Sequence, residues 1–165
     1  MGDDAHNLRR LFETVSLRAP ENAVGFVLWR IVQRYQREMD RSLQSLDLTN
    51  LQFVTLALAA WLSQAGEPVN QTAIARFGGI HPMQLSQMLK ILETKGFICR
   101  KRSDHDTRAK EITMTSGGLK VLRRAFPRAI EIQHRLFGEA GHPGGKLLAT
   151  LQKLDRSQAE AEQGE

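Results

Sequence analysis

The 165-residue sequence contains a single cysteine, Cys99, and no long apolar run. One cysteine excludes an internal disulfide framework and a zinc site built on several cysteines. No uncharged apolar stretch has the length that a bilayer requires, and the first ten residues lack the apolar segment of a secretory signal. We therefore expect one soluble, cytoplasmic globular domain without a membrane partner.

Motifs of the common enzyme classes are also missing. The chain has no phosphate-binding loop, no nucleophile elbow, no dinucleotide-binding fingerprint and no HExxH sequence. Its five histidines are scattered without the spacing of metal ligands. We therefore expect no enzymatic activity, no cofactor and no bound metal.

Positive charge is concentrated in one quarter of the chain. The sequence has 23 Lys and Arg against 18 Asp and Glu, which gives a net charge of +5. Between Gln84 and Arg124, ten basic residues stand against four acidic ones, so this segment has a net charge of +6. Such a stripe is typical of a nucleic-acid-binding surface, although a solvated charged face has the same composition.

The first part of the chain predicts two helices. Residues 1–19 are expected to form an arm or a short extra helix. From Pro20 onwards, apolar residues recur every three or four positions, which predicts a long amphipathic helix. Thr49 and Gln52 then form a capping box for a second, largely buried helix that ends near Gly66.

Two short helices joined by a glycine turn follow. Asn70 is suited to cap the first of them, which stops at the Gly78–Gly79 pair. Pro82 begins the second, and Gly96 ends it. This arrangement predicts a helix-turn-helix.

A β-hairpin and further helices complete the predicted fold. Residues 97–102 and 111–115 flank a turn-rich stretch, which is typical of a hairpin. A helix is expected after Thr115, with a kink at Pro127, and a last helix over residues 146–154. The fold class is therefore mainly α with a small β-hairpin wing: a winged helix-turn-helix with flanking dimerisation helices.

The flanking helices suggest a second copy of the chain. One helix-turn-helix contacts few bases, and specific binding usually needs two half-sites about one helical turn apart. The apolar faces of the first and last helices are suited to form the shared interface. We expect an arm or short helix over 1–19, a helical dimerisation region over 20–48 and 116–156, a DNA-binding region over 49–115 and a frayed tail over 157–165.

The second helix of the helix-turn-helix is the candidate recognition helix. Leu85, Leu89 and Leu92 cluster on one side and are expected to face the core. Amide and hydroxyl groups on the other side can contact base edges in a major groove, and Gln pairs well with adenine. The alternative is an ordinary solvated face. The predicted DNA contacts are His81, Pro82, Met83, Gln84, Ser86, Gln87 and Lys90.

The stretch from Gly79 to Arg100, followed by Asp106-Thr107-Arg108-Ala109-Lys110, resembles the MarR family of bacterial transcriptional regulators. The resemblance extends from about Asn22 to Leu154. Its most specific part is the wing sequence Asp-x-Arg-x-Lys. It implies a homodimer in which the N-terminal helix and the last two helices intertwine, and a function that is most often repression.

The resemblance also implies roles for the wing. Arg108, oriented by Asp106, is implied to enter the minor groove, where a narrow A·T-rich segment concentrates negative potential. The alternative for Asp106 is a turn-capping carboxylate. The predicted wing residues are Arg100, Lys101, Arg102, Asp106, Arg108 and Lys110.

Family members commonly lose DNA affinity when a small aromatic or phenolic ligand binds. Such a ligand shifts the protein toward a non-binding spacing of its two recognition helices. Candidate residues for the ligand cleft are Trp29, Tyr35, Phe53 and Trp61, although these side chains could simply belong to the core.

We therefore predict a sequence-specific regulator that binds double-stranded DNA as a homodimer, with a small aromatic effector. The alternative is a winged-helix protein-interaction module without operator-specific DNA binding. A protein-binding wing would expose apolar residues, whereas this wing is rich in Arg and Lys.

Overall fold

The structure is a computed structural model that describes residues 2–66, 68–102 and 110–162. The chain divides into two compact units, Met1–Glu38 and Met39–Glu165. No single helix of the described residues is long and apolar enough to cross a membrane; a bent pair, Asp4–Leu46 with Asn50–Ala65, meets this requirement by length and composition alone.

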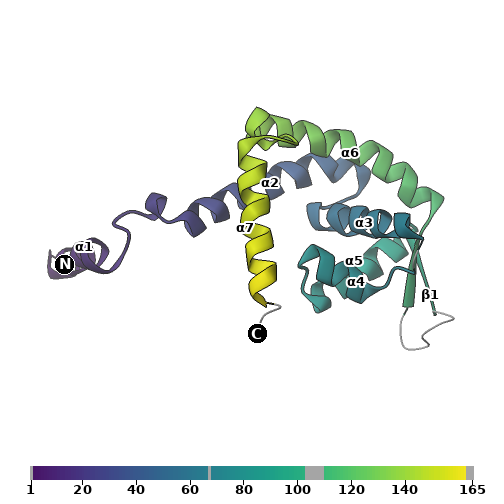
Figure 1. Cartoon of the computed structure of the whole chain (residues 1–165), viewed down its shortest axis with the longest axis horizontal. Helices are drawn as coiled ribbons and strands as arrows, with labels where there is room; N and C mark the ends of the chain where they lie inside the picture. The colour runs from purple at the N-terminus through teal and green to yellow at the C-terminus, as the bar shows by residue number, and fades with distance from the viewer. Residues whose placement is uncertain (1, 67, 103–109, 163–165) are drawn as a thin grey trace. The chain divides into compact units, whose positions relative to one another are not determined.

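The first unit contains helix α1 (Gly2–Val15), a 3-10 turn (Pro20–Asn22) and most of helix α2 (Val24–Leu43) (Figure 1). The sequence predicts that the long helix begins at Pro20, but in the structure it begins at Val24. Pro20 opens the 3-10 turn instead, and its carbonyl oxygen accepts from the N–H of Ala23, which has an extended backbone. This extended residue separates the proline turn from α2.

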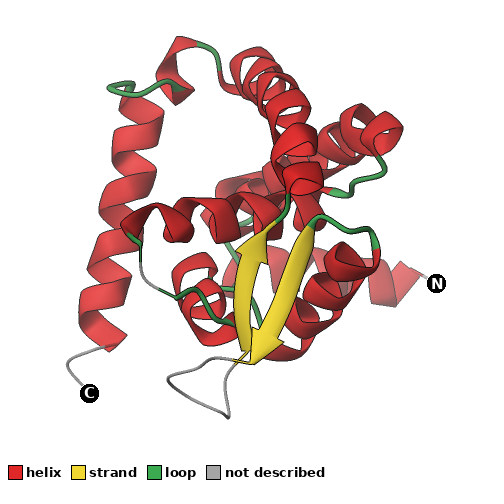
Figure 2. Cartoon of the chain, turned by 90° about the vertical axis from the view of Figure 1, so that its right-hand side faces the viewer, coloured by secondary structure: helices red, strands yellow, loops and turns green. Residues whose placement is uncertain are grey.

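The second unit contains the predicted winged helix-turn-helix. Figure 2 shows its two strands as one antiparallel hairpin beside the helices. Its elements, in chain order, are the 3-10 turn Gln44–Leu46, α3 (Asn50–Leu62), the turn Ser63–Ala65, α4 (Gln71–Gly78), α5 (Pro82–Thr94), β1 (Ile98–Arg102), β2 (Lys110–Met114), α6 (Ser116–Phe137), the turn Glu139–Gly141 and α7 (Lys146–Glu162).

Side-chain caps at the helix starts explain why the elements begin where the sequence predicts. The hydroxyl of Thr49 accepts from the N–H of Gln52, and the Gln52 amide oxygen accepts from the N–H of Thr49, each at 3.3 Å. The Asn70 side chain accepts from the N–H of Ala73 at 2.9 Å. These bonds satisfy backbone donors that a helix leaves unpaired in its first turn. Both predicted helix starts are confirmed.

The core of the second unit lies between α3, α5, α6 and the hairpin. The rings of Phe53 on α3 and Phe126 on α6 meet edge to face, with centroids 5.6 Å apart. The hairpin is joined to the segment before α4, because Ile112 donates its N–H to the Val69 carbonyl oxygen at 2.7 Å. The largest fully buried side chains are Met39, Leu43, Leu56, Ile74, Leu85, Leu89, Leu92, Ile98, Ile132 and Thr55.

Helix α6 includes Pro127, the residue at which the sequence predicts a kink, and buried Ala125 and Ala129 lie on either side of it. One C-terminal boundary differs from the sequence prediction. Helix α7 runs to Glu162 and not to Leu154. The residues after Leu154 include strong helix formers such as Gln, Ala and Glu and no glycine or proline until Gly164, so nothing local ends the helix earlier.

Candidate nucleic-acid interface

The turn between α4 and α5 fixes the angle of the candidate recognition helix. Gly79 has φ +59°, a left-handed conformation that suits glycine. The Gln71 side chain at the start of α4 donates to the carbonyl oxygen of Pro82 at 3.1 Å. His81 caps α5, since its Nδ1 accepts from the N–H of Met83 at 3.3 Å. The first turn of α5 is therefore held by α4 and by its own cap.

Helix α5 has one buried face and one solvent face. Leu85, Leu89 and Leu92 are fully buried, as the helical spacing predicts, and Met88 is half-buried. The N-cap and the remaining surface of the helix carry the seven predicted DNA contacts. These residues are His81, Pro82, Met83, Gln84, Ser86, Gln87 and Lys90, and each is exposed.

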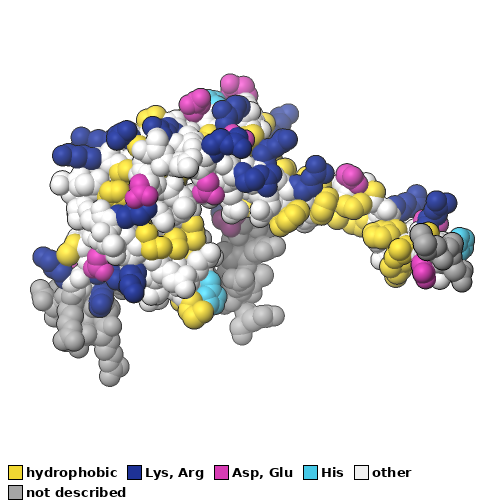
Figure 3. Space-filling view, turned by 180° about the vertical axis from the view of Figure 1, so that it is seen from behind, with side chains coloured by type: hydrophobic (Ala, Val, Ile, Leu, Met, Phe, Trp, Pro, Cys, Tyr) yellow, Lys and Arg dark blue, Asp and Glu magenta, His cyan; other side chains and the backbone are white. Residues whose placement is uncertain are grey.

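The wing places additional positive charge next to α5. Lys101 on β1 and Lys110 on β2 are exposed, and Figure 3 shows Lys and Arg side chains at the hairpin end of the second unit. Arg102 pairs with Lys110 in the strand register. The predicted contacts Asp106 and Arg108, together with the side chain of Arg102, lie outside the described residues.

Arg100 is held by α5. Its Nε and Nη2 donate to one carboxylate oxygen of Glu93 at 2.9 and 2.5 Å, and its backbone N–H donates to the other oxygen at 3.2 Å. The Arg100 side chain is 15% exposed. The hydrogen bond and charge of Arg100 lower the pKa of Glu93 below its ordinary value. In this structure Arg100 therefore joins the wing to α5 instead of extending into solvent.

Lys95, beyond the end of α5, makes a contact that sequence reasoning missed. Its Nζ donates to the Asp47 carbonyl oxygen at 2.5 Å and to the Gln52 side-chain oxygen at 3.1 Å, and it lies 3.1 Å from the Asp47 carboxylate. The end of α5 is thus tied to the start of α3. Asp47 is about fifty positions away in sequence, so no local pattern could have revealed this pairing.

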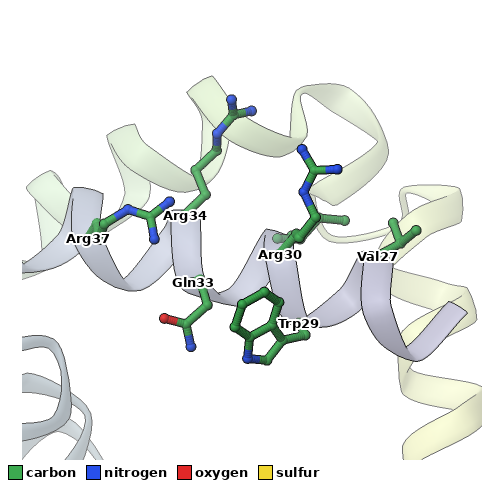
Figure 4. Close-up of a pocket in the computed structure, with 7 residues that line it drawn as sticks. Val27, Trp29, Arg30, Gln33, Arg34 and Arg37 are labelled. Atoms are coloured by element: carbon green, nitrogen blue, oxygen red, sulfur yellow. The ribbon is translucent and has the colours of Figure 1, made fainter. Parts of the chain in front are cut away.

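The four aromatic residues proposed for a ligand cleft lie in different environments. Phe53 is 7% exposed and belongs to the core, which was the alternative interpretation, whereas Trp61 is 59% exposed. Tyr35 is half-buried, and burial raises the pKa of its hydroxyl. Trp29 is 58% exposed and lines a pocket of about 460 Å³ on α2 (Figure 4). Its other lining residues are Val27, Arg30, Ile31, Gln33, Arg34 and Arg37.

Residues 48–110, which contain the helix-turn-helix and the first strand of the hairpin, match the model of the MarR family. The chain is 33% identical over 135 residues to the uncharacterized HTH-type transcriptional regulator YdcH of Bacillus subtilis, an alignment that covers 82% of this chain and 91% of YdcH. The chain belongs to the MarR family. Members of this family are transcriptional regulators and not enzymes.

Solved MarR-family structures have the same fold. CouR from Rhodococcus jostii RHA1, solved with bound p-coumaroyl-CoA, is similar with a TM-score of 0.72 and 25% identity over 86% of this chain and 95% of CouR. MepR of S. aureus, solved in a DNA complex, is similar with a TM-score of 0.70 and 24% identity over 85% of this chain and 99% of MepR. The predicted winged helix-turn-helix fold is therefore confirmed.

Proposed function

We propose that this MarR-family regulator represses transcription as a homodimer on a pseudo-palindromic operator in double-stranded DNA. Each protomer inserts α5 into a major groove and places its wing on the adjacent minor groove. A small aromatic or phenolic effector lowers the affinity for the operator. Such a regulator acts in the cytoplasm, where its DNA lies.

The observation that supports DNA binding is the composition of the exposed face of α5 and of the hairpin beside it. Gln84 and Gln87 expose amide groups, which can pair bidentately with adenine, and the exposed Lys90, one turn after Gln87, supports a phosphate contact. Lys101 and Lys110 add exposed cations next to this face. A related fold, that of MepR, has been solved in complex with DNA.

Exposed apolar side chains in each unit support the homodimer. The first unit exposes Leu8, Leu11 and Phe12 on α1 and Val24, Leu28 and Val32 on α2. The second unit exposes Leu147, Leu151 and Leu154 at helical spacing on α7. Apolar rows of this extent usually mark an interface, because exposing them to water is unfavourable. The dimerisation region over 20–48 and 116–156 contains most of them.

The effector part of the proposal is supported by CouR, which was solved with p-coumaroyl-CoA, the thioester of a phenolic acid. A ligand changes operator affinity only to the extent that it prefers one conformation of the dimer over the other. A phenolic ligand that favours a non-binding spacing of the two α5 helices would therefore release the operator.

The experiment is selection of bound fragments from genomic DNA, followed by affinity measurements on the selected site at several salt concentrations. A palindrome with half-sites about one helical turn apart is expected. If the dimer neutralises about six phosphates, the log-log slope of affinity against salt will be about −5. No enriched sequence, or a flat salt dependence, would contradict the proposal and favour a protein-interaction module. Light scattering at micromolar concentration tests the dimer.

A further inference from the structure

Helix α1 exposes an apolar face. Leu8, Leu11, Phe12 and Val15 recur at the three- and four-residue spacing that places side chains on one side of a helix. These four side chains are between 48% and 73% exposed. None of residues 4–38 is buried, and Figure 3 shows apolar side chains over much of this unit. A helix of 14 residues is only marginally stable in water without packing, so this face needs a partner.

The charge of α1 does not suit DNA or a membrane surface. Three acidic residues and two arginines give the helix a net charge of −1. Duplex DNA carries a dense negative charge, and helices that lie on membranes are rich in Lys and Arg on their polar face. An apolar stripe flanked by charges of both signs is instead typical of a helix that packs against another helix.

The apolar face is self-complementary in an antiparallel arrangement. When two copies of α1 pack antiparallel about the middle of the stripe, Leu8 of one copy lies level with Val15 of the other. Leu11 then lies close to its own counterpart. A two-fold axis relates the two copies, so the same patch supplies both sides of the contact.

The charges beside the stripe favour the same antiparallel arrangement. Arg9 and Glu13 are exposed and lie on one flank of the stripe, because each residue turns the helix by about 100°. Antiparallel packing places Arg9 of each copy level with Glu13 of the other, which gives two symmetric pairs of opposite charge. A parallel pair would instead bring each charged side chain level with its own counterpart.

We propose that α1 binds α1 of a second copy of this chain as an antiparallel helix pair. Four apolar side chains on each copy are few compared with the roughly 20–30 residues per side of a stable interface. The α1 pair therefore adds to the proposed dimer interface and does not replace it. The inference goes beyond the proposed function, because α1 lies outside the dimerisation region over 20–48 and 116–156.

Disulfide cross-linking of the full chain with Cys99→Ser tests the arrangement. Leu11→Cys should form a covalent dimer under mild oxidation. Leu8→Cys alone and Val15→Cys alone should not, because each lies about 10 Å along the helix axis from its own counterpart, beyond the roughly 7 Å between Cα atoms that a disulfide allows. Coexpressed Leu8→Cys and Val15→Cys chains should cross-link with each other. The control is Arg10→Cys on the opposite face of α1, which should not cross-link.

The pattern of cross-links decides the outcome. Absence of a covalent dimer in Leu11→Cys, or an equal yield in Arg10→Cys, would overturn the inference. Cross-linking of Leu8→Cys with itself would indicate a parallel pair and would overturn the antiparallel arrangement.

Sedimentation equilibrium measures what the apolar face contributes. Leu11→Gln keeps a good helix former and should weaken self-association about tenfold or more, which is the loss expected for leucine side chains that are no longer buried. The matched control, Arg10→Gln on the opposite face, should associate like the parent. Equal self-association by Leu11→Gln and the parent would contradict the proposed helix pair.

Operator binding by the same variants separates this inference from the proposed function. Cross-linking through α1 without operator binding contradicts the proposed function and leaves the helix pair standing. Operator binding without cross-linking at Leu11 overturns the helix pair and leaves the proposed function standing. If α1 binds lipid instead, the parent will co-sediment with phosphatidylglycerol vesicles and Leu11→Gln will not, which also overturns the inference.

Discussion

Arg100 and Glu93 join the wing to the recognition helix through three hydrogen bonds. Two come from the guanidinium of Arg100 and one from its backbone N–H, and they engage both oxygens of the Glu93 carboxylate. Glu93 lies in the last turn of α5, and Arg100 lies on β1. The exposed Lys101 next to it is therefore held in a defined position relative to the face of α5 that carries Gln87.

Replacing Glu93 with Gln should lower the free energy of unfolding at pH 7 by about 1 kcal/mol, because a partly exposed charged contact becomes a neutral one. Arg100 lowers the pKa of Glu93 from its ordinary 4.5. A carboxylate with a lowered pKa stabilises the folded state above the unfolded pKa and loses this effect as the pH falls through the folded pKa. The difference from the parent should therefore shrink below about pH 4.5.

Urea unfolding at pH 7, 5, 4 and 3 measures this difference. Glu131→Gln on the exposed surface of α6 is the control and should match the parent at each pH. A loss of stability in Glu93→Gln that stays constant from pH 7 to pH 3 would show that the ion pair is not its cause.

Replacing Lys95 with Met should lower the free energy of unfolding by about 1 to 2 kcal/mol. The change removes the donor to the Asp47 carbonyl oxygen and to the Gln52 side chain, which is itself buried. The matched control is Lys120→Met, an exposed lysine on α6. Chemical denaturation compares the two variants, and equal losses would contradict a specific role for Lys95.

Features of the fold could be predicted from the sequence where the interactions that cause them join residues only a few positions apart. The capping box of Thr49 and Gln52 and the cap of Asn70 bind backbone groups three positions away, so the helix starts were predictable. Gly79 ends α4 because a left-handed residue is needed there, and glycine adopts that conformation without strain. The order of these local signals was enough to predict the winged helix-turn-helix.

Contacts between elements were not predictable in the same way. The sequence predicts that Arg100 faces DNA with the other wing cations. Nothing in the residues next to it along the chain indicates that the turn after α5 brings its side chain to Glu93. Lys95 and Asp47 meet only after α3 and α5 have packed together. The roles of Asp106 and Arg108 came from resemblance to the MarR family and remain predictions.

Replacing Gln87 with Ala should weaken binding to the selected operator by about 1 to 3 kcal/mol and change binding to random DNA little. The reason is that an exposed amide on α5 contributes a base contact, which random sequences do not offer consistently. Fluorescence anisotropy with both DNAs measures the two affinities. Equal losses on operator and random DNA would mean that Gln87 contacts the backbone.

Replacing Arg108 with Ala should weaken operator binding and leave dimerisation and the melting temperature unchanged. The expected reason is loss of a guanidinium from the minor groove, which also flattens the salt dependence of binding. Arg10→Ala, an exposed arginine on α1 outside the basic segment of residues 84–124, is the control. A lower melting temperature in Arg108→Ala would instead assign the residue a structural role.

Replacing Gly118 with Ala should destabilise the protein by about 1 to 3 kcal/mol, because a Cβ there collides with the Phe97 carbonyl oxygen and lies 2.9 Å from the Met114 side chain. Gly118 is in the first turn of α6, where the helix crosses the base of the hairpin. Gly25→Ala on α2 is the matched control: its Cβ meets nothing within 4 Å, and alanine favours a helix by about 0.5 to 1 kcal/mol. The free energy of unfolding, measured with urea, should therefore fall for Gly118→Ala and rise for Gly25→Ala. Stabilisation by both substitutions would show that the start of α6 shifts freely against the wing, and the close approach at Phe97 would then have no role in positioning the hairpin.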